Sequence, residues 1–186
     1  MSETTPCPAV EQAPVRRSSL AEVVRAVRDL RLSMRAEGVV RPGVSSPGCR
    51  AGARFGKRNV PAGDQAPAQV RRWAAGLLMR WGRADVVQDA MTVLTELVTN
   101  ASQAGAVRVV VVIEPDAGPD VIEVCVWDDA PGVPRMREPD FCAERGRGLF
   151  MVDALAVSWG HHRLLHGPGH PGKVVWAALA SRAGQQ

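Results

Sequence analysis

Glu96 and Asn100 are the first residues whose types and spacing could do chemistry. Because they are four positions apart, their side chains meet on one face of a helix, next to its apolar stripe. The carboxylate of Glu96 can accept a proton. The amide oxygen of Asn100 is a suitable ligand for a Mg²⁺ ion that already holds phosphates. The alternative is an ordinary polar helix face, and this interpretation is favoured when the pair is considered alone.

Asp128 ends a second stretch of interest. Strand alternation places it on the same side as Ile122, Val124 and Val126. If that side faces the core, the carboxylate needs a donor, because burying a lone carboxylate is costly. The exocyclic amine of adenine is one such donor, and Gly132 would leave space for the base. The alternative is a carboxylate that merely starts a turn, where Asp and Pro are common.

The third stretch is Arg145-Gly-Arg-Gly148, which is followed by apolar residues. A glycine pair that opens a helix leaves backbone N–H groups free to receive phosphate oxygens, and the two arginines add positive charge. The pattern is neither a Walker A loop nor a GxGxxG motif after a first strand, which excludes both common nucleotide folds. The alternative is a simple glycine turn.

The elements that must position these residues follow from hydrophobic periodicity. Apolar residues at helical spacing predict an amphipathic helix over 70–81, closed by Gly82, and a second helix over about 85–103. β-Branched runs predict strands over 106–114 and 121–128, which form a hairpin around an intervening Pro/Gly turn.

The C-terminal part continues with a short helix from about Gly148 and two last strands at 155–165 and 173–180. Helices gathered on one side of such a sheet make an α+β protein. The predicted fold is therefore a two-layer α/β sandwich, with helices on one face of a mixed, mostly antiparallel sheet.

The N-terminal part differs in composition. It begins with a Pro-, Ser-, Thr- and Glu-rich stretch that is typical of disorder, followed by a predicted amphipathic helix near 19–37 and a Gly/Pro/Ser linker. The apolar stripe of that helix could dock on the domain, on a second copy or on a partner. The predicted organisation is a disordered extension over 1–52 that carries this one helix, a domain over 53–181 and a tail over 182–186.

Charge and composition exclude several classes of protein. The net charge is +4, and the first 50 residues carry eight Arg against five acidic residues, so most of the surplus lies outside the predicted domain. A nucleic-acid binder concentrates positive charge on its folded surface, so we expect no direct nucleic-acid partner. No apolar run approaches the ~20 residues that cross a bilayer, and the start lacks a signal-peptide layout. The four cysteines form no CxxC pair, which indicates a reduced, cytoplasmic protein.

The order of the three stretches resembles the signature boxes of the GHKL superfamily of histidine-kinase-like ATPases. A Glu/Asn pair on a helix precedes Asp-x-x-x-Gly after a strand, and GxGL before a helix comes last. The resemblance covers about residues 53–180. Within the superfamily, the blocks LTELVTNA, GRGLFMVDALA, SWG and GKVVW are similar to those of the bacterial anti-sigma-factor serine/threonine kinases.

This resemblance implies a Bergerat-type fold that binds ATP and Mg²⁺. It gives Asn100 the role of Mg²⁺ ligand and Glu96 the role of accepting the proton of an attacking serine hydroxyl. It implies that Asp128 holds the adenine amine and that Gly132 shapes the base pocket. The implied ATP-binding residues are Asn100, Asp128, Gly132, Gly146, Arg147, Gly148 and Leu149, of which the glycines and Arg147 form a phosphate lid.

The resemblance also implies partners: a sigma factor, an anti-sigma antagonist that receives the phosphate, and a second copy in a homodimer. Three residues depart from the family pattern. Ala104 replaces a frequent histidine, Ala130 replaces the first glycine of the Asp-x-Gly-x-Gly box, and Val174 replaces a Thr or Ser. These departures motivate an alternative, in which the protein is an ATP-responsive binding module or scaffold that transfers no phosphate.

All four histidines, His161, His162, His166 and His170, lie in one late segment. Their density raises a zinc site as an alternative. However, the glycines and prolines of residues 167–171 break any helix that would align them, so we expect a solvated loop between two strands. Because no histidine precedes residue 161, the N-terminal helix cannot be the phosphoacceptor helix of a sensor histidine kinase.

Overall fold

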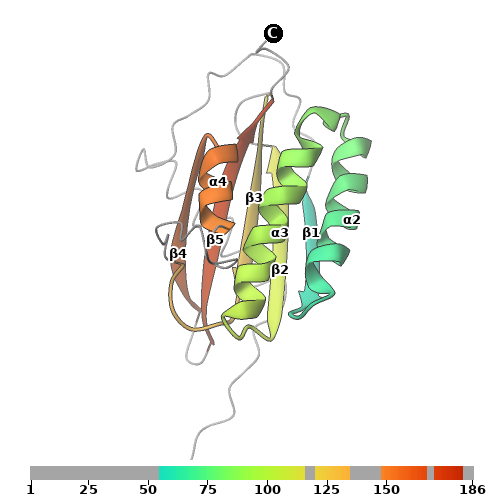
Figure 1. The fold of residues 1–186 in the computed structure, drawn as a ribbon. Helices are drawn as coiled ribbons and strands as arrows, with labels where there is room; N and C mark the ends of the chain where they lie inside the picture. Colours follow the sequence, from blue (N-terminus) through green and yellow to red (C-terminus); the bar gives the residue numbers. More distant parts are fainter. Residues whose placement is uncertain (1–54, 116–119, 135–147, 167–169, 182–186) are drawn as a thin grey trace, which may run out of the picture.

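The computed structural model describes residues 55–115, 120–134, 148–166 and 170–181. The predicted extension over 1–52, with its helix near 19–37, and the predicted tail over 182–186 lie outside these residues. Two layers make up the described part, a sheet and a set of helices that covers one of its faces (Figure 1).

Five strands form the sheet, in the order β1-β2-β3-β5-β4. All four pairings between them are antiparallel. The α+β class is therefore confirmed, but the described part of the sheet contains no parallel pair, although the sequence predicted a mixed sheet. The strands are β1 (Gly56–Pro61), β2 (Arg108–Pro115), β3 (Val121–Asp128), β4 (Ser158–His166) and β5 (His170–Ala180).

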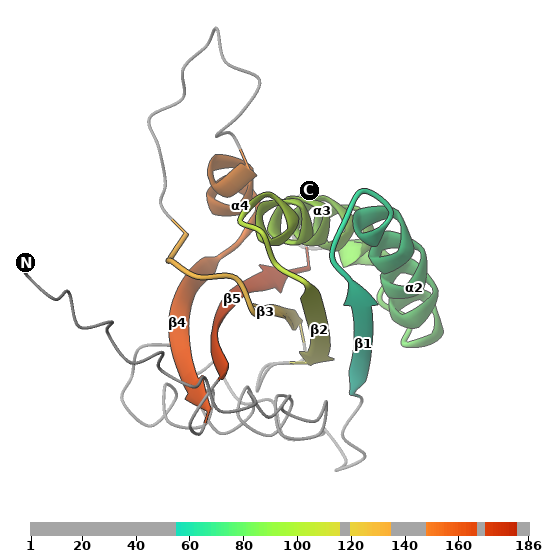
Figure 2. The ribbon, with the colours of Figure 1, turned by 90° about the horizontal axis from the view of Figure 1, so that it is seen from below.

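Three α-helices lie side by side on one face of the sheet (Figure 2). They are α2 (Ala66–Arg80), α3 (Val87–Gln103), which follows the short 3-10 helix η1 (Ala84–Val86), and α4 (Gly148–Leu155). The central helix α3 packs between the other two and faces β3 and β5. This placement brings its polar residues close to the ends of the two central strands.

Helix α3 forms because its apolar residues recur at helical spacing and bury one stripe against the sheet. Its fully or almost fully buried residues are Val87, Ala90, Val93, Leu94, Leu97, Val98 and Ala101. Gly105 follows the helix with φ of +84°, a conformation that favours glycine. A hydrogen bond from Arg71 Nη1 to Thr95 Oγ1 (3.1 Å) joins α2 to α3.

Strand alternation on β3 decides which residues reach the helices. Ile122, Val124 and Val126 belong to the core beneath the helices, and Asp128 continues the same side. Opposite Asp128 on the neighbouring strand β5 lies Lys173. The predicted row of apolar residues ending in a carboxylate is thus confirmed, and the row ends beside a lysine.

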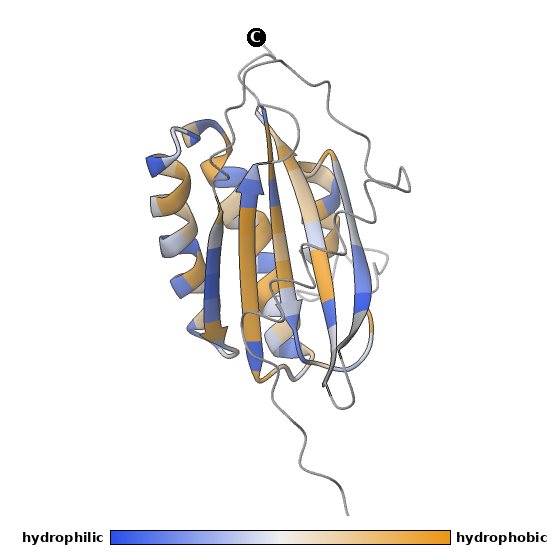
Figure 3. Cartoon of the chain, turned by 180° about the vertical axis from the view of Figure 1, so that it is seen from behind, coloured by the Kyte–Doolittle hydropathy of each residue, from blue (hydrophilic) through white to orange (hydrophobic). Residues whose placement is uncertain are grey.

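The other face of the sheet is also apolar, and Figure 3 shows it from behind. Its buried apolar side chains are Val110, Val112, Cys125, Trp127, Val174, Trp176 and Ala178, none of them more than 4% exposed. The buried carboxylate of Glu123 lies on the same face and accepts a hydrogen bond from Cys125 Sγ at 3.3 Å. No described helix lies on this face. Glycines accommodate the two indoles, since a Cβ on Gly172 would lie 2.5 Å from Trp127 Nε1 and a Cβ on Gly160 would lie 2.9 Å from the ring of Trp176.

The edge strand β1 was not predicted from the sequence. Only its first and fifth residues are buried, and three exposed polar residues lie between them. Such a strand has no apolar alternation, because an edge strand is solvated along one side and Pro61 is tolerated at its end. It is held in place by β2 and by α2, where a Cβ on Gly56 would overlap Leu77.

Strands β4 and β5 extend into the segment that was expected to be a solvated loop between the predicted strands 155–165 and 173–180. His161, His162 and His166 lie on β4, and His170 begins β5, where it pairs with His166. Among the described residues, no group of three or more His, Cys, Asp and Glu side chains could hold a metal ion.

Candidate functional site

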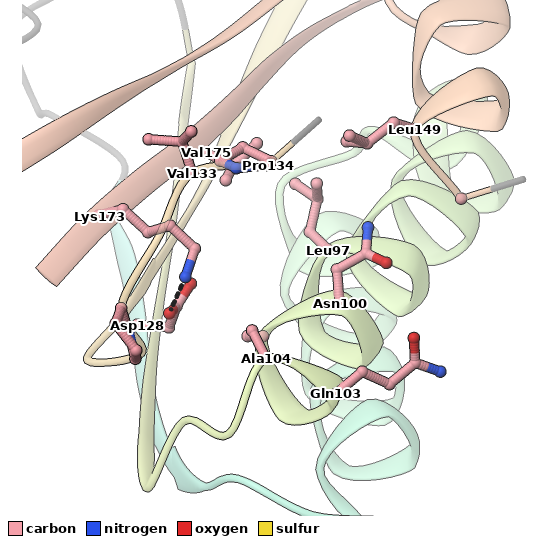
Figure 4. A pocket seen from close by; sticks show the side chains of 13 residues that line it. Leu97, Asn100, Gln103, Ala104, Asp128, Val133, Pro134, Leu149, Lys173 and Val175 are labelled. Atoms are coloured by element: carbon pink, nitrogen blue, oxygen red, sulfur yellow. Dashed lines mark hydrogen bonds and ion pairs between the residues drawn. The ribbon is translucent and has the colours of Figure 1, made fainter. Parts of the chain in front are cut away.

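A pocket of about 300 Å³ opens between α3 and the ends of β3 and β5 (Figure 4). This volume is at the lower end of the usual range for small-molecule sites, about 300–1,000 Å³. Its wall is mostly apolar with a few polar groups. The lining residues are Leu97, Asn100, Ala101, Gln103, Ala104, Asp128, Pro131, Val133, Pro134, Gly148, Leu149, Lys173 and Val175.

The helix side of the site brings Gly148 against Glu96 and Asn100, which the sequence predicted only to share one helix face. A Cβ on Gly148 would lie 2.6 Å from Glu96 Oε2 and 3.3 Å from Asn100 Nδ2. The backbone at the start of α4 therefore lies directly against both polar side chains, at a distance that only glycine allows. Asn100 lines the pocket, whereas Glu96 lies one turn earlier and is not part of its wall.

Glu96 is a partly buried carboxylate. Burial raises the pKa of Glu96 above its ordinary value, because a low-dielectric surrounding disfavours the charged form. A carboxylate with a raised pKa is a stronger proton acceptor than an exposed one.

The sheet side of the site is built around an ion pair between Asp128 and Lys173. Lys173 Nζ lies 2.6 Å from Asp128 Oδ1, and the two side chains are only 6% and 2% exposed. The same ammonium lies 3.3 Å from the carbonyl oxygen of Ala130, whose N–H donates to Asp128 Oδ1 at 3.0 Å. Oδ1 thus accepts two hydrogen bonds, while Oδ2 has no partner among the described residues.

Two opposing effects act on the carboxyl of Asp128. Burial raises the pKa of Asp128, and the hydrogen bond and charge of Lys173 oppose that rise. Such burial is tolerated only when the charge is paired. The neighbouring Asp129 points elsewhere, because its Oδ1 accepts from the N–H groups of Val107 and Arg108 at 2.8 and 3.0 Å.

The remaining predicted residues are distributed unequally around the pocket. Leu149 is buried and lines it. Gly132 lies at the exposed rim with φ of +89°, and a Cβ there would contact nothing within 4 Å. The positive φ of the turn therefore requires glycine at this position, and a close approach of other atoms does not. Gly146 and Arg147 lie outside the described residues.

The three departures from the family pattern also differ in their positions. Ala104 lines the pocket, and Ala130 is buried against the Asp128–Lys173 pair. Val174 faces the opposite side of the sheet, opposite Trp127, so its side chain does not bear on the pocket. The residue of this strand that faces the pocket is Lys173.

Lys173 is the functional candidate that sequence reasoning missed. The available signal was a single charge at the start of the apolar run 173–180, in a β-strand whose alternation continues through the buried Val175 and Ala177. What the sequence alone could not show was its register opposite Asp128, which is 45 positions away.

A model of the histidine kinase-like ATPase domain matches residues 60–178, well over half of the chain. The chain belongs to this family. The family description is that of an ATPase, which implies ATP as the ligand of this pocket. No curated protein matches the chain significantly.

Two solved structures resemble this histidine kinase-like ATPase domain. The RsbU and RsbW domains of a Mycobacterium tuberculosis protein share 18% identity over 68% of this chain and 32% of that one, with a TM-score of 0.47. The histidine kinase domain of a blue-light activated kinase from Erythrobacter litoralis shares 18% identity over 89% and 76% of the two chains, with a TM-score of 0.33. The chain thus spans about a third of the first structure's length.

The donors present in this ATPase domain fit a Mg²⁺ ion that is held mainly by a nucleotide. Asn100 supplies one amide oxygen in the pocket wall, and Mg²⁺ commonly takes one or two protein ligands together with phosphates and water.

Among the helices that the structure describes, none has the length and apolar character required to cross a membrane.

Proposed function

We propose that the pocket binds Mg-ATP, with the adenine at Asp128 and the phosphates toward Asn100 and Gly148. The observation that carries this proposal is the buried carboxylate of Asp128 in the pocket wall, whose Oδ2 has no partner among the described residues. Asn100 lines the same pocket (Figure 4). Leu97 and Val175 would contact the flat faces of the base. The start of α4 would approach the phosphates with free N–H groups.

We further propose that the protein is an anti-sigma-factor serine/threonine kinase. The oxygen of a serine hydroxyl on an anti-sigma antagonist would attack the γ-phosphorus, its proton would pass to Glu96, and ADP would leave. Bound Mg²⁺ would neutralise charge on the phosphates. In this reaction class the protein contributes mainly positioning and charge stabilisation. Sequestering a sigma factor, and pairing as a homodimer, belong to the same proposal.

Calorimetric titration of Mg-ATP tests the nucleotide site. Asp128→Asn should weaken binding by about tenfold or more, the usual worth of a hydrogen bond to a charged group. Asp153→Asn is the matched control, since Asp153 is exposed and accepts one bond from Trp159 Nε1, which an amide oxygen can also accept. Equal affinity of the wild type and Asp128→Asn would refute the placement of the base. Heat is preferred to fluorescence because Trp127 lies on the other face of the sheet.

A labelled-phosphate assay with [γ-³²P]ATP and proteins that co-purify with the chain tests the kinase step. Glu96→Gln should abolish transfer to a serine of the partner while ATP still binds. Normal transfer by that variant would show that Glu96 is not the proton acceptor.

A second function is favoured by one observation: Glu96 lies outside the pocket wall, behind the backbone of Gly148. On this alternative the domain binds ATP and changes its affinity for a regulatory partner without phosphorylating it. Nucleotide-dependent partner binding with no labelled product would favour this alternative over the kinase.

A further inference from the structure

We propose that Lys173, together with Asp128, recognises the base of the bound nucleotide by a direct hydrogen bond. The inference rests on the proposed function, because it concerns the same pocket. It assigns to Lys173 a direct contact with the ring nitrogen N1 of adenine, beside the amine that Asp128 accepts.

The first step concerns the hydrogens of the ammonium group. A lysine ammonium has three N–H donors. In this structure one donates to Asp128 Oδ1 and a second is directed at the carbonyl oxygen of Ala130. The third has no partner among the described residues. Since Lys173 lines the pocket, this donor is available to a ligand.

The second step concerns the acceptor next to it. Asp128 Oδ1 is occupied by Lys173 and by the N–H of Ala130, which leaves Oδ2 as an acceptor. The ion pair therefore presents one donor and one acceptor side by side to the same pocket. Both groups are fixed in place, because their charges are buried and paired.

The third step is the complementary ligand edge. Adenine offers an amine donor on C6 and, adjacent to it, the acceptor N1. The amine would donate to Asp128 Oδ2 and N1 would accept from Lys173 Nζ. Guanine also offers an adjacent acceptor and donor, but it carries a further amine on C2. That amine would face the apolar wall of Leu97, Val133 and Val175, where an unpaired donor is costly.

The experiment compares ATP with 1-deaza-ATP, in which N1 is replaced by C–H, on the full-length wild type. ATP should bind about tenfold or more tightly, because the lost bond has a charged donor. In Lys173→Met the two nucleotides should bind alike, and Lys173→Arg should restore part of the preference. Lys57→Met, at an exposed position on β1, is the control for the loss of one positive charge. This variant should keep the preference for ATP over 1-deaza-ATP.

Equal binding of ATP and 1-deaza-ATP by the wild type would overturn the inference and leave the nucleotide site intact. This comparison needs no variant, so a folding defect in Lys173→Met cannot obscure it. GTP binding as tight as ATP would overturn the assignment to adenine. Failure of the wild type to bind any of these nucleotides would overturn the proposed function and this inference together.

A different observation carries a second inference, which concerns the second face of the sheet. Its seven apolar side chains are almost fully buried, yet all described helices lie on the opposite face. In addition, the indole N–H groups of Trp127 and Trp176 are buried and lack a hydrogen-bond partner among the described residues. An apolar face of this size needs a cover, because exposed patches of this kind promote association.

We propose that the segment 19–37 of the same chain covers this face. Its sequence places six apolar residues on one helical stripe and arginines on the others. It is joined to β1, at the edge of this sheet, by residues 38–55, which is ample chain to reach any strand. The apolar residues of the stripe are Leu20, Val23, Val24, Val27, Leu30 and Met34.

Thiol labelling of Cys125 tests this cover, because Cys125 is fully buried in the second face. Full-length Val27→Asp should label several-fold faster than wild type, with the labelled cysteine located by mass spectrometry. Arg25→Asp, two residues away and on the opposite side of the predicted helix, should leave the rate unchanged. An unchanged rate in Val27→Asp would refute the proposal. A labelling rate that falls as protein concentration rises would refute it too, because the cover would then be a second copy.

Discussion

At the scale of single residues, two carboxylates in one domain are prepared for different tasks by their surroundings. Asp128 is paired with Lys173 and keeps one oxygen for a ligand. Glu96 is less deeply buried, and this burial raises the pKa of its carboxyl. Burial raises the pKa of both carboxyls, but at Asp128 the charge of Lys173 opposes the rise. Asp128 is therefore suited to binding and Glu96 to proton transfer.

The raised pKa of Glu96 gives a testable pH dependence. A proton acceptor works only when it is deprotonated, so phosphotransfer should rise with pH through a midpoint above the ordinary glutamate value. Burial causes the shift, and its direction places the acidic limb at higher pH than for an exposed carboxylate. Rates measured across the acidic range, under conditions where ATP binding is saturated, provide the check. A midpoint at or below the ordinary value would contradict the assignment.

At the scale of elements, the start of α4 is fitted to the polar face of α3 through Gly148. Only a residue without a Cβ can bring this backbone against Glu96 and Asn100. The position therefore belongs to the site and not to the stability of the helix, in which alanine is more favourable than glycine.

Gly148→Ala should accordingly separate activity from stability. The new methyl group would displace Glu96 Oε2 and crowd Asn100, so phosphotransfer and Mg-ATP affinity should fall. Thermal unfolding should change little. Gly76→Ala in α2 is the control, because its Cβ would meet only Arg80 Nη1 at 3.5 Å. That control should be stabilised by roughly 0.5–1 kcal/mol with unchanged activity. Full activity in Gly148→Ala would show that the close approach has no functional role.

At the scale of the whole molecule, the sheet is packed on both faces, and only one face carries the site. On the other face, Arg108 Cζ lies over the indole of Trp127, 5.4 Å from the ring centroid. The backbone of Gly172 also lies close to this indole. Gly172 directly precedes Lys173, so packing on the second face positions the residue that holds Asp128 on the first.

Gly172→Ala tests this connection between the two faces. Its Cβ would lie 2.5 Å from Trp127 Nε1, and overpacking of this kind typically costs about 1–3 kcal/mol. Chemical denaturation should show this loss, together with weaker Mg-ATP binding. Adding Trp127→Leu should recover part of the loss, because the smaller side chain gives room to the new methyl group. A double variant whose losses are simply additive would exclude direct contact as the cause.

The sequence by itself determined the features that depend on local periodicity. The helix over 87–103 with Glu96 and Asn100 on one face, and the placement of Asp128 on the core side of its strand, follow from periods of 3.6 and 2. The order of the three polar stretches also indicated the family that the chain belongs to. Strand β3 has the predicted bounds, β5 begins three residues earlier than predicted, and the other element boundaries move by only a few residues.

Only the tertiary structure decided the features that join distant parts of the chain. Strand β1 has no apolar pattern of its own, and pairing with β2 and packing against α2 hold it in the sheet. The contact of Gly148 with Glu96, and the register that sets Lys173 opposite Asp128, likewise join segments that are far apart in sequence. Local propensity carries no information on such contacts, because they form only when the helices and the sheet pack around one core.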